Sequence, residues 1–270
     1  MDRTIAYQTI DLNYKAHTPG STARTPPLVL IHGFAEDSSV WDNQTAYLKN
    51  THKLIIPDLP GSGRSPLLSG DTSMEDLAGA VKAVLDAEGI NDCVMVGHSM
   101  GGYVTLAFAE LYPQMLKAIG LFHSTSFGDS EEKKTIRRKA IDFIRKNGPG
   151  PFIKQSTPNL FSETSRKQHP EWINMLIERY ADFHPDSLIR YYEAMIRRPD
   201  RSAVLQQFPR PVLFIIGEQD STIPLNISLQ QSHMPDVSYI YILEHAGHMG
   251  MLEEAVRSNH ILEEFLNELL

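Results

Sequence analysis

One short stretch limits what this chain can fold into more than any other. The apolar run CVMV (93–96) predicts a buried strand and is followed at once by GHSMG (97–101). Residues 103–112 then show a mostly apolar helical pattern that Pro113 ends. Small residues two positions before and after Ser99 permit a tight turn that holds its hydroxyl at the end of the strand. The flanking pattern favours this strand, turn and helix over a glycine-rich turn with a solvated serine. Ser99 is therefore our candidate nucleophile.

Short apolar runs alternate with helical patterns along most of the chain. Residues 5–16 alternate well enough for one or two antiparallel strands, whereas the later runs are continuously apolar, as in strands covered on both faces. We therefore predict an α/β fold, with a doubly wound, mainly parallel eight-stranded sheet flanked by helices. The later strands are expected at residues 27–31, 53–56, 94–96, 118–122, 211–216 and 237–243, and a closing amphipathic helix at 255–269.

The alternation breaks between residues 124 and 200. This segment contains helical patterns and aromatic residues but no convincing strand, so we expect a helical cap (124–200) inserted between two parts of one core (1–123 and 201–270). The helices expected in the cap are at residues 131–146, near Phe152, at 172–180 and at 185–196, with a turn at 147–151.

Composition narrows the possible partners. The 270 residues carry a formal net charge of −8 and no dominant basic run, which argues against nucleic acid or an anionic membrane surface as a partner. The polar N-terminus and the absence of long apolar runs favour a cytoplasmic protein. We expect it to act on a small-molecule acyl substrate, as a monomer or homodimer. A single cysteine, Cys93, rules out an intrachain disulfide and is expected to be a buried thiol.

A serine hydroxyl needs an imidazole to take its proton and a carboxylate to orient that imidazole. Asp220 follows a predicted strand in GEQD (217–220), and His248 follows the last predicted strand. We therefore predict Ser99, Asp220 and His248 as a catalytic triad. Glu218 competes for the carboxylate role but lies nearer the strand. His245 competes for the base role and is expected to pack at the strand end.

Two other kinds of site are disfavoured. The pair His245 and His248 has no third ligand at a spacing typical of metal sites. The loop at residues 57–65 lacks a complete dinucleotide-binding glycine pattern, because Pro66 stands where the third glycine belongs. We expect neither a metal nor an organic cofactor.

The remaining site residues follow from the charge that develops during acyl transfer. A tetrahedral intermediate needs two donors for its oxyanion, and we expect the backbone N–H groups of Met100 and Phe34 to supply them. His32 is expected to stabilise the same loop as Phe34. The substrate pocket should have walls from Phe34, Met100 and Met249. Cap aromatics could add to these walls; the candidates are Phe127, Phe152 and Trp172.

Several motifs together resemble the α/β-hydrolase fold family, of the capped serine esterase type. They are HGF (32–34), DLPGSGRS (58–65), GHSMGG (97–102), GEQD (217–220) and GH (247–248), and they span nearly the whole chain. The order serine, aspartate, histidine is also the order of this family. The resemblance implies hydrolysis of a small or medium carboxylic ester, thioester or lactone through an acyl-enzyme on Ser99. Its departures are Ala255, where many relatives have proline, and Tyr103, where relatives in menaquinone synthesis carry arginine.

Two alternatives remain open at this stage. The same triad serves hydrolases that cleave carbon–carbon bonds. A ligand receptor of this fold with very slow turnover would also keep the triad. A serine at position 99 makes haloalkane dehalogenases and epoxide hydrolases poor matches, because these relatives use an aspartate nucleophile.

Overall fold

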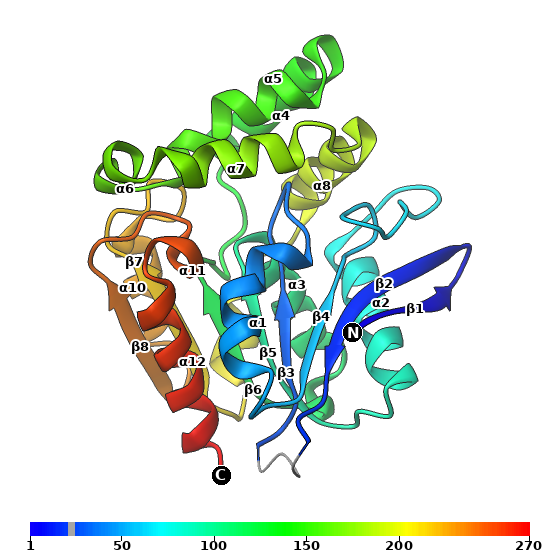
Figure 1. Ribbon diagram of the computed structural model, residues 1–270, viewed down its shortest axis with the longest axis vertical. Helices are drawn as coiled ribbons and strands as arrows, with labels where there is room; N and C mark the ends of the chain where they lie inside the picture. Colours follow the sequence, from blue (N-terminus) through cyan, green and yellow to red (C-terminus); the bar gives the residue numbers. More distant parts are fainter. Residues whose placement is uncertain (21–24) are drawn as a thin grey trace.

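A twisted sheet of eight strands forms the centre of the computed structural model, which describes residues 1–20 and 25–270 (Figure 1). The strand order is β1-β2-β4-β3-β5-β6-β7-β8, with β1, β2 and β4 paired antiparallel and all other pairs parallel. The predicted doubly wound, mainly parallel sheet is confirmed. The strands are β1 (Asp2–Tyr7), β2 (Ile10–His17), β3 (Leu28–Ile31), β4 (Leu54–Pro57), β5 (Cys93–His98), β6 (Leu116–Phe122), β7 (Val212–Gly217) and β8 (Ser238–Leu243).

Helices cover both faces of the sheet (Figure 1). Helices α1 (Asp42–Leu48) and α12 (Ala255–Glu268) pack on one face, and α2 (Met74–Ala87) and α3 (Met100–Leu111) pack on the other. Successive strand residues point to opposite faces. Thus the central strand β3 contributes Leu28 and Leu30 to the core under α1 and α12, and Val29 and Ile31 to the core under α2 and α3. This two-sided burial explains the continuous apolar runs of the central strands.

Short helical elements complete the two flanks of the sheet. Sequence patterns did not predict most of them, because three to eight residues are too few to show a helical period. They are η1 (Ser38–Trp41), η2 (Pro113–Met115), α9 (Ser202–Gln207), α10 (Leu225–Ser232) and α11 (Gly250–Glu253). No helix in the described parts of the chain is both long enough and apolar enough to cross a membrane.

A layer of helices, called here the helical layer (131–197), lies above the carboxyl ends of the strands (Figure 1). The expected turn at 147–151 is shorter than predicted. Only Gly148 leaves the helical conformation, with φ of 81°, and Pro149 already begins the next helix, where its fixed φ is favourable. The elements of the layer are α4 (Glu131–Asn147), α5 (Pro149–Ser156), η3 (Thr157–Leu160), α6 (Glu163–Gln168), α7 (Pro170–Tyr180) and α8 (Pro185–Arg197).

Two connecting segments (124–130 and 198–201) join the helical layer to β6 and α9, and they run side by side. The backbone N–H of Arg201 donates to the carbonyl of Ser126 (2.8 Å), and the backbone N–H of Gly128 donates to the carboxylate of Asp200 (3.2 Å). The Arg198 guanidinium donates to a carbonyl of the first segment, that of Phe127 (2.9 Å). The layer therefore leaves the sheet and returns to it at one place.

Candidate active site

The turn from β5 into α3 holds Ser99 in an unusual backbone conformation, with φ of 50° and ψ of −114°. A residue with a side chain is strained there, so the surroundings must hold it in place. The Ser99 N–H donates to the carbonyl of Phe122 (2.9 Å), and the Ser124 hydroxyl donates to the Ser99 carbonyl (2.7 Å). A Cβ on Gly101 would overlap backbone oxygens at the end of β3, so only glycine lets α3 pack this closely.

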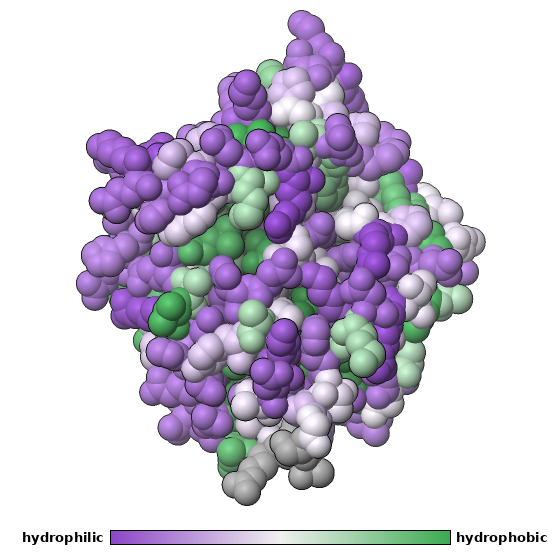
Figure 2. All heavy atoms as spheres, viewed as in Figure 1, coloured by the Kyte–Doolittle hydropathy of each residue, from purple (hydrophilic) through white to green (hydrophobic). Residues whose placement is uncertain are grey.

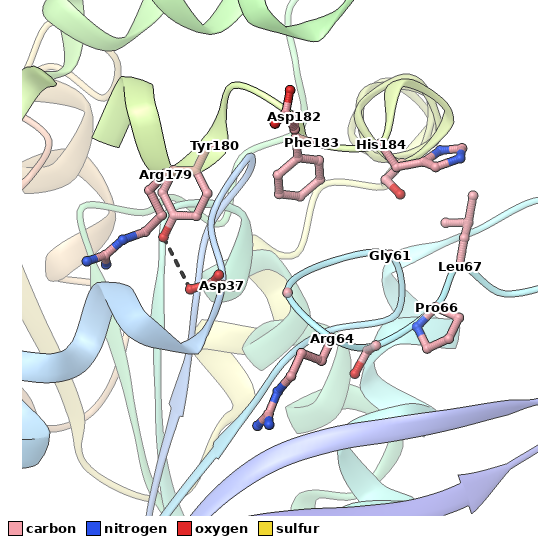
Figure 3. Close-up of a pocket in the computed structure, with 13 residues that line it drawn as sticks. Asp37, Gly61, Arg64, Pro66, Leu67, Arg179, Tyr180, Asp182, Phe183 and His184 are labelled. Atoms are coloured by element: carbon pink, nitrogen blue, oxygen red, sulfur yellow. Dashed lines mark hydrogen bonds between the residues drawn. The ribbon is translucent and has the colours of Figure 1, made fainter. Parts of the chain in front are cut away.

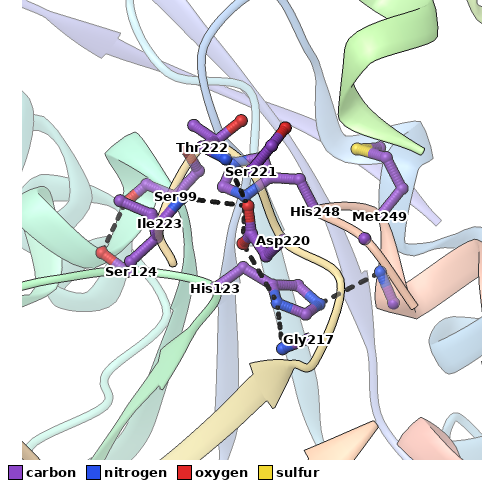
Figure 4. A network of polar contacts seen from close by, with 12 residues as sticks. Ser99, His123, Ser124, Gly217, Asp220, Ser221, Thr222, Ile223, His248 and Met249 are labelled. Carbon is purple, nitrogen blue, oxygen red and sulfur yellow. Dashed lines mark hydrogen bonds and ion pairs between the residues drawn. The ribbon is translucent and has the colours of Figure 1, made fainter. Parts of the chain in front are cut away.

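Asp220 and His248 meet in the loops that follow β7 and β8 (Figure 4). His248 Nδ1 lies 2.7 Å from Asp220 Oδ2, and the other carboxylate oxygen accepts the N–H groups of Thr222 (2.8 Å) and Ile223 (2.9 Å). Burial opposes ionisation of Asp220. The attraction and hydrogen bond of His248, together with the other donors, outweigh it and lower the pKa of Asp220 below its ordinary value. Asp220 is therefore an anion that orients the ring of His248.

Glu218 and His245, the alternatives to Asp220 and His248, both lie at the surface. Glu218 is exposed to solvent, while Asp220 is buried. His245 is also exposed, so the expectation that it packs at the strand end is wrong; its backbone N–H donates to Glu254 (2.8 Å) and leaves the ring outside. His32 bridges two loops, because its Nε2 accepts the N–H of Leu59 (3.0 Å).

A cavity of about 260 Å³ contains both Ser99 and His248 and lies between the strand ends and the helical layer. On the face of the molecule that Figure 2 shows, hydrophobic residues (green) gather in a hollow beneath the layer. The cavity is lined by Phe34, Ala35, Glu36, His98, Ser99, Tyr103, Arg137, Phe152, Ile153, Ser156, Thr157, Asn159, Leu160, Leu176, Tyr180, Tyr192, Met195, Thr222, His248 and Met249.

The expected wall residues divide into two groups. Phe34, Phe152 and Met249 line the cavity. Three others do not. The Met100 side chain is fully buried in the core beneath α3, Phe127 lines a separate surface cavity, and Trp172 stacks on His169 at 4.0 Å between ring centroids. Met100 points into the core because it is the first residue of α3 and follows directly on the strained turn.

The two N–H groups expected to bind an oxyanion are available. Among the described residues, neither the Phe34 N–H nor the Met100 N–H donates a hydrogen bond to another protein group. For Met100 this follows from its place at the start of α3, where backbone donors have no partner within the helix. Both residues adjoin the cavity that contains Ser99.

A buried ion pair beneath the cavity was not anticipated from the sequence. His98 Nδ1 lies 3.0 Å from Glu36 Oε2, and His98 Nε2 lies 2.9 Å from the carbonyl oxygen of His248. Burial disfavours charge on His98, but the attraction and hydrogen bond of Glu36 outweigh it and raise the pKa of His98. At Glu36, burial alone would raise the pKa, but the attraction and hydrogen bond of His98 outweigh it and lower the pKa. The protonated ring can thus donate to Glu36 and to the backbone of His248.

His123 is a second buried histidine that sequence reasoning missed. It follows β6 directly, with φ of 48°, as Ser99 follows β5. Its Nδ1 lies 3.6 Å from Asp220 Oδ2, and its ring nitrogens face the N–H groups of Gly217 (3.0 Å) and Gly250 (3.1 Å) (Figure 4). Burial, with smaller effects of His248 and His98, lowers the pKa of His123 well below its ordinary value. The available signal was its position: a polar residue directly after an apolar strand.

A larger cleft of about 550 Å³ opens nearby but contains none of Ser99, Asp220 and His248 (Figure 3). It lies between the loop after β4 and the segment joining α7 to α8. Tyr180 lines both this cleft and the cavity, and its hydroxyl donates to Asp37 (3.3 Å). Within the described residues, no three histidine, cysteine or acidic side chains are grouped so that they could hold a metal ion.

Comparison with known proteins decides the family. A family model described as "Alpha/beta hydrolase family" matches residues 28–258. The chain belongs to the alpha/beta hydrolase family. The resemblance drawn from the sequence motifs is thereby confirmed at the level of family and fold.

Three relatives within the wider set of hydrolases illustrate the likeness. A thermophilic esterase from Thermogutta terrifontis, solved with malate bound, superposes with a TM-score of 0.92 at 28% identity over 100% of this chain and 99% of that chain. A 2-hydroxy-6-oxononadienedioate/2-hydroxy-6-oxononatrienedioate hydrolase from Paraburkholderia phymatum is 28% identical, covering 94% of this chain and 91% of the relative. A protein from Pseudomonas savastanoi named "Putative carbamate hydrolase RutD" is 27% identical, covering 91% of this chain and 95% of the relative.

Proposed function

We propose that this protein is a serine hydrolase that cleaves carboxylic esters through an acyl-enzyme on Ser99. The observation that carries the proposal is the 2.7 Å contact of His248 with ionised Asp220, beside a cavity shared by His248 and Ser99. Because Nδ1 of His248 faces Asp220, Nε2 is left to accept a proton. The likeness to the Thermogutta esterase supports an ester substrate.

In the proposed reaction, His248 takes the hydroxyl proton of Ser99 as Ser99 Oγ attacks the carbonyl carbon of the ester. The backbone N–H groups of Phe34 and Met100 bind the resulting oxyanion. When the intermediate collapses, His248 gives its proton to the leaving alcohol, and the acyl group stays on Ser99. Water, deprotonated by His248, then releases the acid and restores the enzyme. No step needs a metal or an organic cofactor.

The cavity sets the expected substrate size. Its volume of about 260 Å³ is at the low end for ligand pockets, so small or medium acyl groups are expected to fit better than long chains. We further propose that residues 124–200 act as the cap of a core formed by residues 1–123 and 201–270. Phe152 and Tyr192 of the helical layer would contact the acyl group, together with Phe34 and Met249 from the core.

Hydrolysis of p-nitrophenyl acetate, butyrate and octanoate tests the nucleophile. Ser99→Ala is expected to lower turnover at least about 10⁴-fold, because no other group supplies the attacking oxygen. Ser156→Ala, which removes a hydroxyl from the same cavity, is the matched control and should stay within about threefold of the parent. Activity that survives in folded Ser99→Ala would refute the assignment.

A matched pair in one loop tests the orienting carboxylate. Asp220→Asn is expected to lower kcat roughly 10⁴-fold, because the amide no longer fixes the tautomer of His248. Glu218→Gln removes an exposed charge two residues away and should leave kcat within about threefold. A loss below about tenfold in Asp220→Asn would instead assign the role to another group.

Cleavage of a carbon–carbon bond by the same triad is the second candidate, favoured by the likeness to the Paraburkholderia hydrolase. The two functions are separated by assaying a vinylogous diketone beside the aryl esters. Folded parent enzyme that cleaves the diketone but none of the three esters would establish this candidate in place of the first.

A further inference from the structure

We infer that the cavity selects substrates that carry a carboxylate near the scissile carbonyl, and that Arg137 is the residue that binds it. This inference rests on the proposed function and specifies its substrate class. Arg137 lies on α4 and lines the cavity that also contains Ser99 and His248. It is the one arginine or lysine among the lining residues that the structure describes.

The guanidinium of Arg137 has donors to spare. Its Nε donates to Asp129 Oδ2 (2.5 Å) and its Nη2 lies 3.4 Å from Asp129 Oδ1. Within the described residues, Nη1 makes no hydrogen bond, although the side chain is only 12% exposed. A guanidinium carries five N–H groups, so the contacts with Asp129 leave several of them without a partner among the described residues.

Asp129 is shared between two arginines, because it pairs with Arg198 (2.9 Å) as well as with Arg137. The Arg198 side chain is 3% exposed and also donates hydrogen bonds to the carbonyls of Met195 and Phe127. Arg198 is therefore hydrogen-bonded within the protein. One carboxylate thus faces two guanidinium groups. Of these two arginines, Arg137 is the one that lines the cavity.

Glu36 is the one acidic residue among the described lining residues, and it is already paired with His98. Lys133, which lines the neighbouring surface cavity, donates to the carbonyl of Thr222 (3.2 Å) and forms no ion pair with a described residue. No carboxylate among the described lining residues is therefore free to bind Arg137.

Tyr103 is affected by the same positive charges, and its hydroxyl offers a second hydrogen-bond donor. Its side chain lines the cavity, and its hydroxyl makes no hydrogen bond to another described residue. Burial alone would raise the pKa of Tyr103. The positive charges of Arg198, Lys133 and Arg137 outweigh burial and lower that pKa.

The surroundings make a carboxylate a favourable occupant. Phe34, Phe152 and Tyr192 form apolar walls, and the Arg137 guanidinium lies 5.5 Å from the centre of the Tyr192 ring. A partly desolvated charge without full hydrogen bonding is unfavourable, and a carboxylate matches the planar guanidinium with two parallel hydrogen bonds. A neutral acyl chain of the same length leaves those donors unpaired.

Two pairs of esters test the inference. Mono-p-nitrophenyl succinate and p-nitrophenyl butyrate differ by a carboxylate on the acyl side, and 4-acetoxybenzoate and phenyl acetate differ by one on the alcohol side. In at least one pair, the parent enzyme is expected to show a kcat/KM for the anionic ester at least about tenfold above the neutral ester. The pair that shows it places the carboxylate in the acyl or the alcohol half.

Arg137→Gln should abolish this preference by lowering kcat/KM for the anionic ester at least about tenfold, while the neutral ester stays within about threefold. Arg137→Lys should restore part of it. Arg138→Gln, which removes an exposed charge from the next position of α4, is the control for long-range electrostatics and should keep the preference. Equal losses for both esters, or the same loss in Arg138→Gln, would overturn the inference.

The inference and the proposed function fail in different ways. Parent enzyme that hydrolyses the neutral esters, shows no preference in either pair and is unaffected by Arg137→Gln would retain the function and refute the role of Arg137. If no ester is hydrolysed, calorimetric titration with monomethyl succinate compares Ser99→Ala with the double variant that also carries Arg137→Gln. Binding by the single variant that is lost in the double variant supports the inference. No binding by either variant refutes it.

Discussion

At the residue scale, the buried ion pair of Glu36 and His98 positions the backbone of the proposed catalytic residue His248. The raised pKa of His98 and the lowered pKa of Glu36 keep both charged, and the His98 ring reaches the backbone carbonyl of His248 at 2.9 Å. Glu36 also accepts the backbone N–H of Gly33 (2.6 Å), next to Phe34. One pair thus ties the loop of the proposed base to the loop of a proposed oxyanion donor.

The pair should make stability depend on pH. The raised pKa of His98 contributes stability that is complete below about pH 6.5 and is lost as pH rises through its folded value. The lowered pKa of Glu36 contributes stability that is complete above about pH 4.5 and is lost as pH falls through its folded value.

Glu36→Gln is therefore expected to lower the free energy of unfolding by about 3 kcal/mol near pH 5.5, with a smaller loss at higher pH. Urea unfolding at a series of pH values measures it. Glu132→Gln, at an exposed position of α4, controls for the loss of one surface charge. A loss that is constant from pH 5 to 9 would show that the pair is not charged.

At the element scale, the junction of β5 with α3 depends on how closely the helix approaches the neighbouring strand. A Cβ on Gly101 would overlap the carbonyl oxygen of Ile31 and come within 2.5 Å of that of His32. These are backbone atoms of β3 and its loop, which also carries Phe34. The helix that presents Ser99 and the loop that presents Phe34 are therefore fixed against each other.

Gly101→Ala is expected to lower the free energy of unfolding by about 3 kcal/mol, because the added methyl group must move α3 or β3. The shift should appear as a lower denaturation midpoint in urea. Gly20→Ala is the matched control, since a Cβ there meets no atom of the described residues within 4 Å. A similar midpoint in both variants would mean that the junction adapts without cost.

The sequence predicted elements best where one physical signal dominated. β3, β5 and β7 were evident because burial on both faces leaves continuous apolar runs. α6 and α10 were missed, because a helix of six or eight residues shows too little periodicity, and propensity alone does not select it. The sequence predicts a turn at residues 147–151. Gly148 forms that turn, whereas Pro149 already begins α5, because its fixed φ suits the first turn of a helix.

At the scale of the whole molecule, the sequence indicates which residues have suitable chemistry but not which ones meet. Ser99, Asp220 and His248 could be proposed because each follows a predicted strand, and parallel strands end at one edge of a sheet. Arg137 and Glu36 had no such signal. Their places in the cavity depend on how α4 and the loop after β3 pack, and a charged residue on a helix usually faces solvent.

The helical layer joins the sheet through two neighbouring segments (124–130 and 198–201), and the carboxylate of Asp129 in the first binds Arg198 in the second. The layer also contacts the loops beneath it, because the Leu160 carbonyl accepts the backbone N–H of His248 (2.6 Å) and the Asn159 carbonyl accepts the Ser221 hydroxyl (3.2 Å). A different set of helices between the two segments would therefore have to replace both contacts. We thus expect the layer and the loops that carry Asp220 and His248 to change together in evolution.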